Sequence, residues 1–149
     1  MNIFKNISFI NKFIRIFETG KEINLSGFSD SEKSILISAL NFKLNKKSVV
    51  VASDLISAGN IENMLIALNL KVGVLKERIN ESVETDWKKA EAKEAKKQEI
   101  SKTVLDFCKG KTEVLIVLPN CLNQNVEAFK ESLDCNITIK VGEILAEMI

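Results

Sequence analysis

Histidine and tyrosine are absent from the 149-residue chain, and tryptophan and proline occur once each, as Trp87 and Pro119. Without histidine, the chain cannot perform Ser-His-Asp or Cys-His catalysis, bind zinc through imidazole, or transfer protons through a histidine near neutral pH. The three cysteines, Cys108, Cys121 and Cys135, form no C-x-x-C motif. An odd number of separated thiols predicts reduced, buried cysteines in a cytoplasmic protein.

Long apolar runs and an excess of one charge are also missing. No uninterrupted apolar run reaches the roughly 18 residues of a membrane-spanning helix, so we expect no membrane association. The N-terminal segment is interrupted by Lys12 and Arg15 and has no small-residue cleavage site, unlike a signal peptide. The 21 Lys and Arg residues against 20 Asp and Glu give a net charge of +1. This balance excludes a strongly basic nucleic-acid-binding arm or an acidic tail.

What the chain does have is a globular composition, with 46% apolar and 28% charged residues, and alternating helix and strand patterns. Apolar side chains at spacings of three and four predict a helix over residues 3–18, which Gly20 ends. Short β-branched or alternating runs predict strands, and amphipathic segments between them predict helices. The expected strands are 23–26, 48–52, 71–75, 113–118 and 137–141. The expected helices that follow them are 30–44, 54–68, 81–108 and 122–133.

This alternation predicts an α/β fold, with a parallel sheet of about five strands, helices on both faces and right-handed crossovers. We expect an N-terminal amphipathic helix in residues 1–20 and a single α/β domain over residues 21–149. The architecture is related to that of P-loop ATPase domains, in which ligands bind where strands lead into helices.

A degenerate phosphate-binding loop is the first candidate site. Gly27, Lys33 and Ser34 fall in register with the pattern G-x-x-x-x-G-K-[ST], between an expected strand and an expected helix. Glu32 replaces the second glycine, and its bulk and negative charge oppose a bound phosphate more strongly than a helix N-terminus favours one. The expected strand at 113–118 also has no following acid to hold magnesium. The residues of this predicted vestigial phosphate loop are Gly27, Ser31, Glu32, Lys33 and Ser34. Weak nucleotide binding and an ordinary capped helix start are the alternatives.

Three stretches of the sequence resemble the N-terminal region of the transcription-repair coupling factor family, which is related to excinuclease B. Leu25–Leu40 resembles the family's degenerate G-x-x-x-S-x-(K/R)-x-x-L-x-x-x-L segment, and Lys47–Asp54 resembles the strand and turn that follow. Ile137–Glu143 resembles the L-x-(V/K)-G strand that precedes the module contacting excinuclease A. The chain departs from the family at residues 76–99, where members usually have a longer loop with proline and aromatic residues.

The resemblance implies that the chain is a fragment, the front end of a larger DNA-dependent ATPase. Such a region is a non-catalytic N-terminal module that scaffolds or restrains a DNA translocase in transcription-coupled repair. It would bind no cofactor itself, because ATP and magnesium are expected only in the motor domains of the parent. Its partners would be those other domains and DNA, while the parent engages RNA polymerase and excinuclease A in the cytoplasm.

Two further features leave alternatives open. The lysines of the charged helix are candidate contacts for DNA or a protein partner, although the glutamates between them favour a solvated helix face. These lysines are Lys88, Lys89, Lys93, Lys96 and Lys97.

Cys121 is expected to be a core thiol, because a C-x5-R phosphatase motif would need arginine where Glu127 stands. The other functions considered are a small nucleotide-binding P-loop-like enzyme using Lys33 and Ser34, and a free-standing protein-interaction domain.

Overall fold

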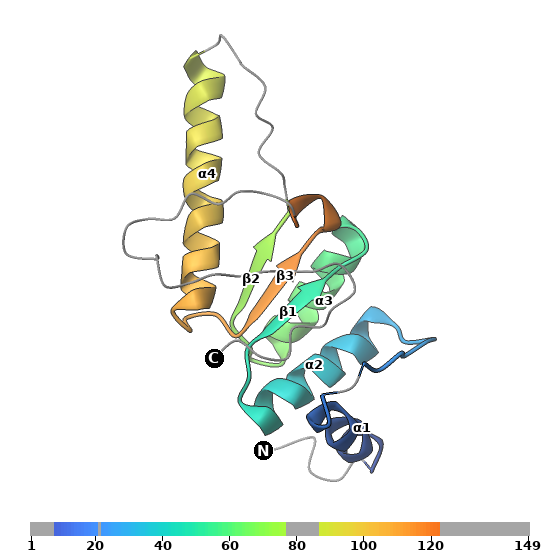
Figure 1. The fold of residues 1–149 in the computed structure, drawn as a ribbon. Helices are drawn as coiled ribbons and strands as arrows, with labels where there is room; N and C mark the ends of the chain where they lie inside the picture. Colours follow the sequence, from blue (N-terminus) through green and yellow to red (C-terminus); the bar gives the residue numbers. More distant parts are fainter. Residues whose placement is uncertain (1–7, 21, 77–86, 123–149) are drawn as a thin grey trace.

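The computed structural model describes residues 8–20, 22–76 and 87–122, with side chains from residue 91 onward in the last range. Figure 1 shows the order of the elements in these ranges. They are α1 (Ser8–Glu18), α2 (Asp30–Leu44), β1 (Ser48–Val51), α3 (Leu55–Ala67), β2 (Val72–Leu75), α4 (Trp87–Cys108), β3 (Val114–Val117) and the 3-10 helix η1 (Pro119–Cys121). The predicted strand over 137–141, Cys135, and all but the first residue of the helix predicted over 122–133 lie outside the described residues.

The described strands form a parallel sheet in the order β1-β3-β2, so β3, the last strand in the sequence, lies in the middle. Ser48 of β1 and Val72 of β2 both lie opposite Val114 of β3. All four residues of β3 are buried, which explains its continuous run of β-branched and leucine residues. The strands predicted over 48–52, 71–75 and 113–118 are therefore confirmed, with small differences at their ends.

The prediction of about five strands is wrong for the part of the chain that is described, where the sheet has three strands. Residues 23–26, expected to form the first strand, have no regular secondary structure. Leu25 is 44% exposed, and only Ile23 packs against a buried cluster, that of α1 and α2. A short alternating run buries too little apolar surface to hold a strand unless a neighbouring strand pairs with it.

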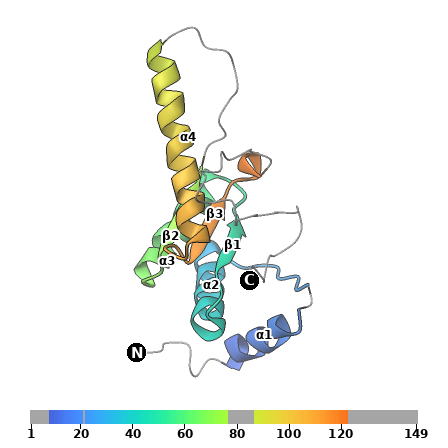
Figure 2. The same cartoon turned by 60° about the vertical axis from the view of Figure 1, so that its left-hand side comes forward.

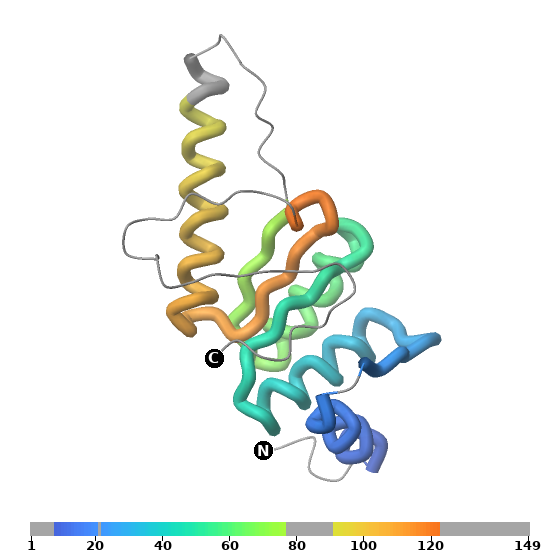
Figure 3. Tube along the Cα trace, in the orientation of Figure 1, coloured from blue at the N-terminus to red at the C-terminus, as the bar shows by residue number. Residues whose placement is uncertain are grey.

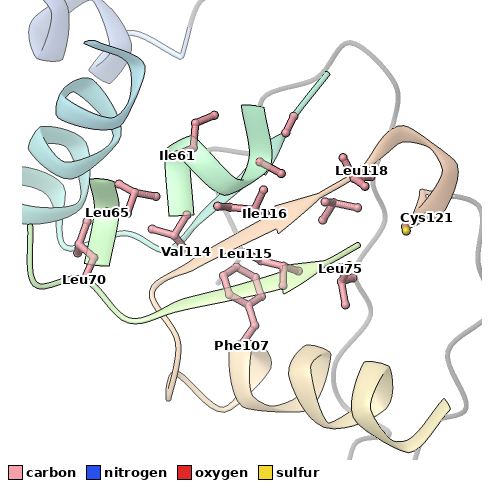
Figure 4. Close-up of a cluster of buried hydrophobic side chains, with 13 residues drawn as sticks. Ile61, Leu65, Leu70, Leu75, Phe107, Val114, Leu115, Ile116, Leu118 and Cys121 are labelled. Atoms are coloured by element: carbon pink, nitrogen blue, oxygen red, sulfur yellow. The ribbon is translucent and has the colours of Figure 1, made fainter. Parts of the chain in front are cut away.

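Helices α3 and α4 cover opposite faces of the sheet (Figures 1 and 2). The close-up in Figure 4 shows Ile61 and Leu65 of α3 approaching β3 from one side and Phe107 of α4 from the other. The crossover through α3 runs from β1 to β2, and the crossover through α4 runs back from β2 to β3. Right-handed connections that move in opposite directions place their helices on opposite faces, as predicted.

Gly73 allows α4 to lie close to β2. A Cβ atom at this position would meet Thr103 Cγ2 of α4 at 3.0 Å and Leu115 Cδ1 of β3 at 3.5 Å. The absence of a side chain at residue 73 therefore sets the distance between this helix and the sheet.

Helices α1 and α2 form a second, smaller core beside the sheet. Ile10, Phe13 and Ile14 of α1 pack with Leu36 and Ala39 of α2. The tube in Figure 3 shows that α1 lies against α2 and away from the strands. The helix predicted over 3–18 is present in its described part, Ser8–Glu18, but its apolar face is only partly buried, because Phe9 and Ile16 are exposed.

Candidate functional site

The N-terminus of α2, which contains the predicted phosphate loop, is closed by its own side chains. Ser29 is the N-cap, and its Oγ accepts a hydrogen bond from Glu32 N at 3.3 Å. Glu32 Oε2 accepts hydrogen bonds from Ser29 N at 2.8 Å and from Ser29 Oγ at 2.7 Å. This reciprocal arrangement is a capping box, which satisfies two backbone donors that a helix otherwise leaves unpaired.

Glu32 therefore takes part in capping α2, a role that differs from the predicted one. Bulk and repulsion were the expected obstacles, whereas the structure shows the carboxylate bonded to a backbone N–H at the helix start. The Ser29 backbone N–H lowers the pKa of Glu32, and the Ser29 hydroxyl lowers it further. The carboxylate is thus ionised at neutral pH, and it places a negative charge where an incoming anion would lie.

Lys33 and Ser34 are also engaged within the loop. Lys33 Nζ lies 3.1 Å from Asp30 Oδ1, and the Ser34 hydroxyl donates to Asp30 O at 2.7 Å. Ser34 is completely buried. In a phosphate loop, the lysine reaches the β- and γ-phosphates and the serine hydroxyl binds magnesium. Here neither group points to an open anion site, and no strand precedes the loop, which differs from the predicted context.

Gly27 and Ser31 contribute only local geometry. Gly27 has φ of +77°, a conformation that glycine adopts without strain. Ser31 is exposed and lines an open hollow of about 680 Å³ between α2 and α3, together with Asn60, Asn63 and Met64. Asp30 is the charged side chain that lines this hollow, so the hollow disfavours a phosphate.

Asp30 connects α2 to α3, a role that no sequence pattern indicated. Its Oδ1 accepts from Ser57 Oγ at 3.0 Å, and its Oδ2 accepts from Asn60 Nδ2 at 3.5 Å. Its pKa is lowered, first by the hydrogen bond from Lys33 and then by that from Ser57. Because Ser57 and Asn60 are about thirty residues away in the chain, no local sequence signal could have identified this connection.

Asp54 caps α3 in the same way as Ser29 caps α2. Its side chain accepts from Ser57 N at 2.8 Å and from Ser53 Oγ at 2.9 Å. The Ser57 backbone N–H is the main cause of the lowered pKa of Asp54. Both helices that start near this end of the sheet therefore have their N-terminal donors satisfied by an acidic residue of the chain.

The candidate lysines lie on α4, whose N-terminal half extends beyond the sheet (Figures 1 and 2). Lys88 and Lys89 belong to this helix, but their side chains are outside the described residues. Lys96 is exposed, whereas Lys93 and Lys97, one helical turn apart, are half-buried. Exposed glutamates separate these lysines along the helix, at positions 91, 94 and 99. Among the described side chains of α4, acidic groups therefore lie between the lysines, and no purely basic surface forms. Contact with DNA stays a prediction.

Lys47 forms an anchor between distant elements that the sequence did not reveal. Its Nζ donates to the backbone oxygens of Phe107 and Cys108, each at 3.1 Å, and lies 5.3 Å from the centre of the Phe107 ring. These carbonyls belong to the last two residues of α4, and Phe107 O also accepts from Gly110 N at 3.1 Å. Lys47 thus connects the start of β1 to the end of α4, sixty residues later.

Cys121 is buried in the sheet core beside Leu118, as predicted for a core thiol. Within the described ranges, no three acidic, cysteine or histidine side chains gather as a metal site would require. In those same ranges, no helix has the length and apolar character needed to cross a bilayer.

Comparison with known proteins gives no further assignment. No protein-family model, curated protein or solved structure matches the chain. The fold and the site therefore define a class only: a small α/β unit with a parallel sheet, in which helix α2 is capped by its own side chains.

Proposed function

We propose that this chain is a non-catalytic module that acts by protein contact, in a scaffolding or restraining role, within a DNA translocase of the transcription-repair coupling type. The observation that carries the proposal is the capping box, in which Glu32 accepts from the backbone N–H and hydroxyl of Ser29. A helix start that is capped by its own carboxylate needs no bound nucleotide, which supports a role in protein contact.

The electrostatics of the loop support the loss of nucleotide binding. A phosphate entering the N-terminus of α2 would have to displace Glu32 and would meet Asp30 nearby. The lysine that would compensate these charges, Lys33, is already paired with Asp30 at 3.1 Å. An anion gains only about 0.3–1 kcal/mol from an exposed helix N-terminus, which does not offset two carboxylates and a missing cation.

The resemblance supports the proposed parent. The stretch Leu25–Leu40 corresponds to the turn, cap and first part of α2, and Lys47–Asp54 corresponds to β1 and the cap of α3. Under this proposal, ATP and magnesium are bound by the motor domains of the parent, which acts in the cytoplasm with RNA polymerase and excinuclease A.

A contact role also suits the surface. Large apolar side chains are exposed on the helices of the smaller core, where Phe9 is 49% exposed and Phe42 is 51% exposed. Exposed single apolar residues are common on folded domains, so they support a contact surface without locating it.

Nucleotide titration of the 149-residue chain tests the non-catalytic part of the proposal. Amide chemical shifts would be followed while magnesium-ATP, ADP or inorganic phosphate is added to the wild type and to Lys33→Ala. We expect no shifts at residues 27–34 at millimolar ligand. Shifts that saturate in the wild type and vanish in Lys33→Ala would instead establish the alternative of a small nucleotide-binding enzyme.

The contact part needs a second assay. The chain would be added to a transcription-repair coupling translocase that lacks its own N-terminal region, and DNA-dependent ATP hydrolysis and co-purification would be measured. We expect binding and a changed hydrolysis rate, with Phe9→Asp weakening both and Lys12→Asp, an exposed site on the same helix, as its matched control. No binding and an unchanged rate would refute the role in a translocase and leave a free-standing interaction domain.

A further inference from the structure

Apolar contacts alone hold helix α1 in place. Its buried residues Ile10, Phe13 and Ile14 pack with Leu36 and Ala39 of α2. Among the described residues, no hydrogen bond or ion pair joins α1 to another helix or to the sheet, and the bonds at its C-terminus stay within the helix and the turn after it. Separating α1 from α2 therefore breaks no polar interaction between these elements.

The segment that joins α1 to α2 adds no polar attachment either. Residues 22–28 have no regular secondary structure, and they form no hydrogen bond with any residue that the structure describes. Ile23 packs against the same cluster as α1, whereas Leu25 is 44% exposed. The ring of Phe28 stacks on that of Phe9, with centroids 6.0 Å apart. These contacts are apolar as well, so the segment does not tie α1 down.

Helix α2, by contrast, is bonded to the rest of the unit. Asp30 Oδ1 accepts from Ser57 Oγ of α3 at 3.0 Å, and Ile37 packs against the sheet core. The capping box at Ser29 holds the first turn of α2 in its helical form. Two residues earlier, Gly27 has φ of +77°, and nothing lies within 4 Å of a Cβ built there. The chain can therefore turn at Gly27 while α2 keeps its position and its cap.

We propose that α1 is a detachable cover of α2, which leaves as a unit, together with residues 22–26, while the sheet core stays folded. The opening uncovers Leu36 and Ala39, which are 6% and 0% exposed when the cover is closed. The closed cover thus withholds an apolar face of α2 from other proteins. This inference does not depend on the proposed function, because it rests only on how α1 is attached.

The difference between the two cores explains why the cover opens before the sheet does. The buried cluster around α1 draws its fully buried side chains from α1 and α2, whereas the sheet core joins α3, α4 and the strands. Hydrophobic stabilisation scales with the apolar area that is buried. Helix α1 is also incompletely covered, since Phe9 is 49% and Ile16 41% exposed. Segments with few buried contacts open at the lowest free energies.

Native-state hydrogen exchange of the 149-residue chain tests the proposal. After correction for intrinsic rates, the amides of Phe13 and Ile14 are expected to exchange on the order of a hundredfold faster than that of Ala52. Ala52 N bonds to Val117 O at 3.0 Å and therefore reports on the sheet. Equal protection would mean that α1 leaves only when the whole chain unfolds. Amides of α1 without any protection would mean that it does not dock as a helix. Either result overturns the proposal.

Two substitutions separate the opening from global unfolding. Phe13 is 8% exposed and packs in the cluster with α2, so Phe13→Ala is expected to raise the exchange rate of Ile14 by about tenfold or more. The rate of Ala52 should stay the same. Lys12→Ala, at an exposed position of the same helix, is the matched control and should change neither rate. An equal rise at Ile14 and Ala52 in Phe13→Ala would show that α1 and the sheet unfold together, against the proposal.

Thiol labelling identifies the surface that the opening uncovers. Ala39→Cys and Ala58→Cys each introduce a thiol at a fully buried alanine, the first in the cluster with α1 and the second in the sheet core. Iodoacetamide is added under native conditions, and peptide mass analysis distinguishes the new thiol from the native cysteines. We expect Ala39→Cys to react at least about tenfold faster than Ala58→Cys, since only the former is exposed when the cover opens. Equal rates for the two variants would contradict the proposed opening.

Discussion

Replacing Lys47 by methionine is expected to loosen the attachment of α4 to the sheet. The change keeps a long apolar side chain but removes the ammonium that bonds to the carbonyl oxygens of Phe107 and Cys108. It also removes the cation that lies 5.3 Å from the centre of the Phe107 ring. Because Lys47 lies immediately before β1, the effect is transmitted to the edge of the sheet as well as to the helix.

The magnitude follows from these contacts. A hydrogen bond to a charged group contributes about 1.5–3 kcal/mol, and a cation above an aromatic ring adds about 0.5–1 kcal/mol at a partly exposed site. The contacts share one ammonium, and a half-buried helix end regains some hydration when that ammonium is lost, so the sum overstates the effect. We expect Lys47→Met to lower the free energy of unfolding by about 2 kcal/mol, or the melting temperature by about 6 °C for a chain of this size.

Urea unfolding followed by circular dichroism measures this difference, with the slope of the transition checked for two-state behaviour. Lys43→Met is the matched control, because Lys43 is an exposed lysine in the last turn of α2. Its substitution is expected to change stability by less than about 0.5 kcal/mol. If both variants were equally stable, the bonds from Lys47 to the end of α4 would carry no net stability and the reasoning would be refuted.

Three other outcomes are expected. The lowered pKa values of Glu32 and Asp54 stabilise the fold above the ordinary carboxyl pKa. That stability is lost as pH falls below about 4.5. Melting curves from pH 7 to 3 should show this loss, and Glu32→Gln should make the decline shallower. Gly73→Ala should cost about 1–3 kcal/mol, because the new Cβ would meet Thr103 Cγ2 at 3.0 Å. Gly59→Ala, in helix α3 with open space around it, should instead stabilise the chain by about 0.5–1 kcal/mol in the same denaturation assay.

Strong local patterns predicted most of the described elements. Three apolar β-branched runs formed the strands, and the helix after Ser29 begins and ends close to its expected limits. The exception at 23–26 is instructive because its alternation covers only four residues. In β1 to β3, parallel pairing in one sheet stabilises equally short segments, and β3 is also fully buried. Residues 23–26 have no partner strand in the described sheet, and their alternating pattern did not produce a strand.

The connections between distant residues could not be predicted. No local sequence pattern around Lys47 or Asp30 indicates a distant partner. Their partners, Phe107 and Ser57, are adjacent to them only after the chain has crossed the sheet. Hydrogen bonds of this kind depend on the placement of whole elements, about which local propensity carries no information.

The capping box at the start of α2 was not predicted from the sequence, and the reason lies in Glu32. A phosphate loop and a capping box both solve the same problem, which is to provide acceptors for the unpaired N–H groups at a helix start. Glycine at position 32 would leave that task to a bound anion, whereas Glu32 performs it internally through Ser29. A helix N-terminus that no phosphate occupies still needs an acceptor, so the same glutamate that opposes nucleotide binding also stabilises the helix. This double effect explains how a sequence can match most of a phosphate-binding pattern and still form a closed, self-sufficient helix start.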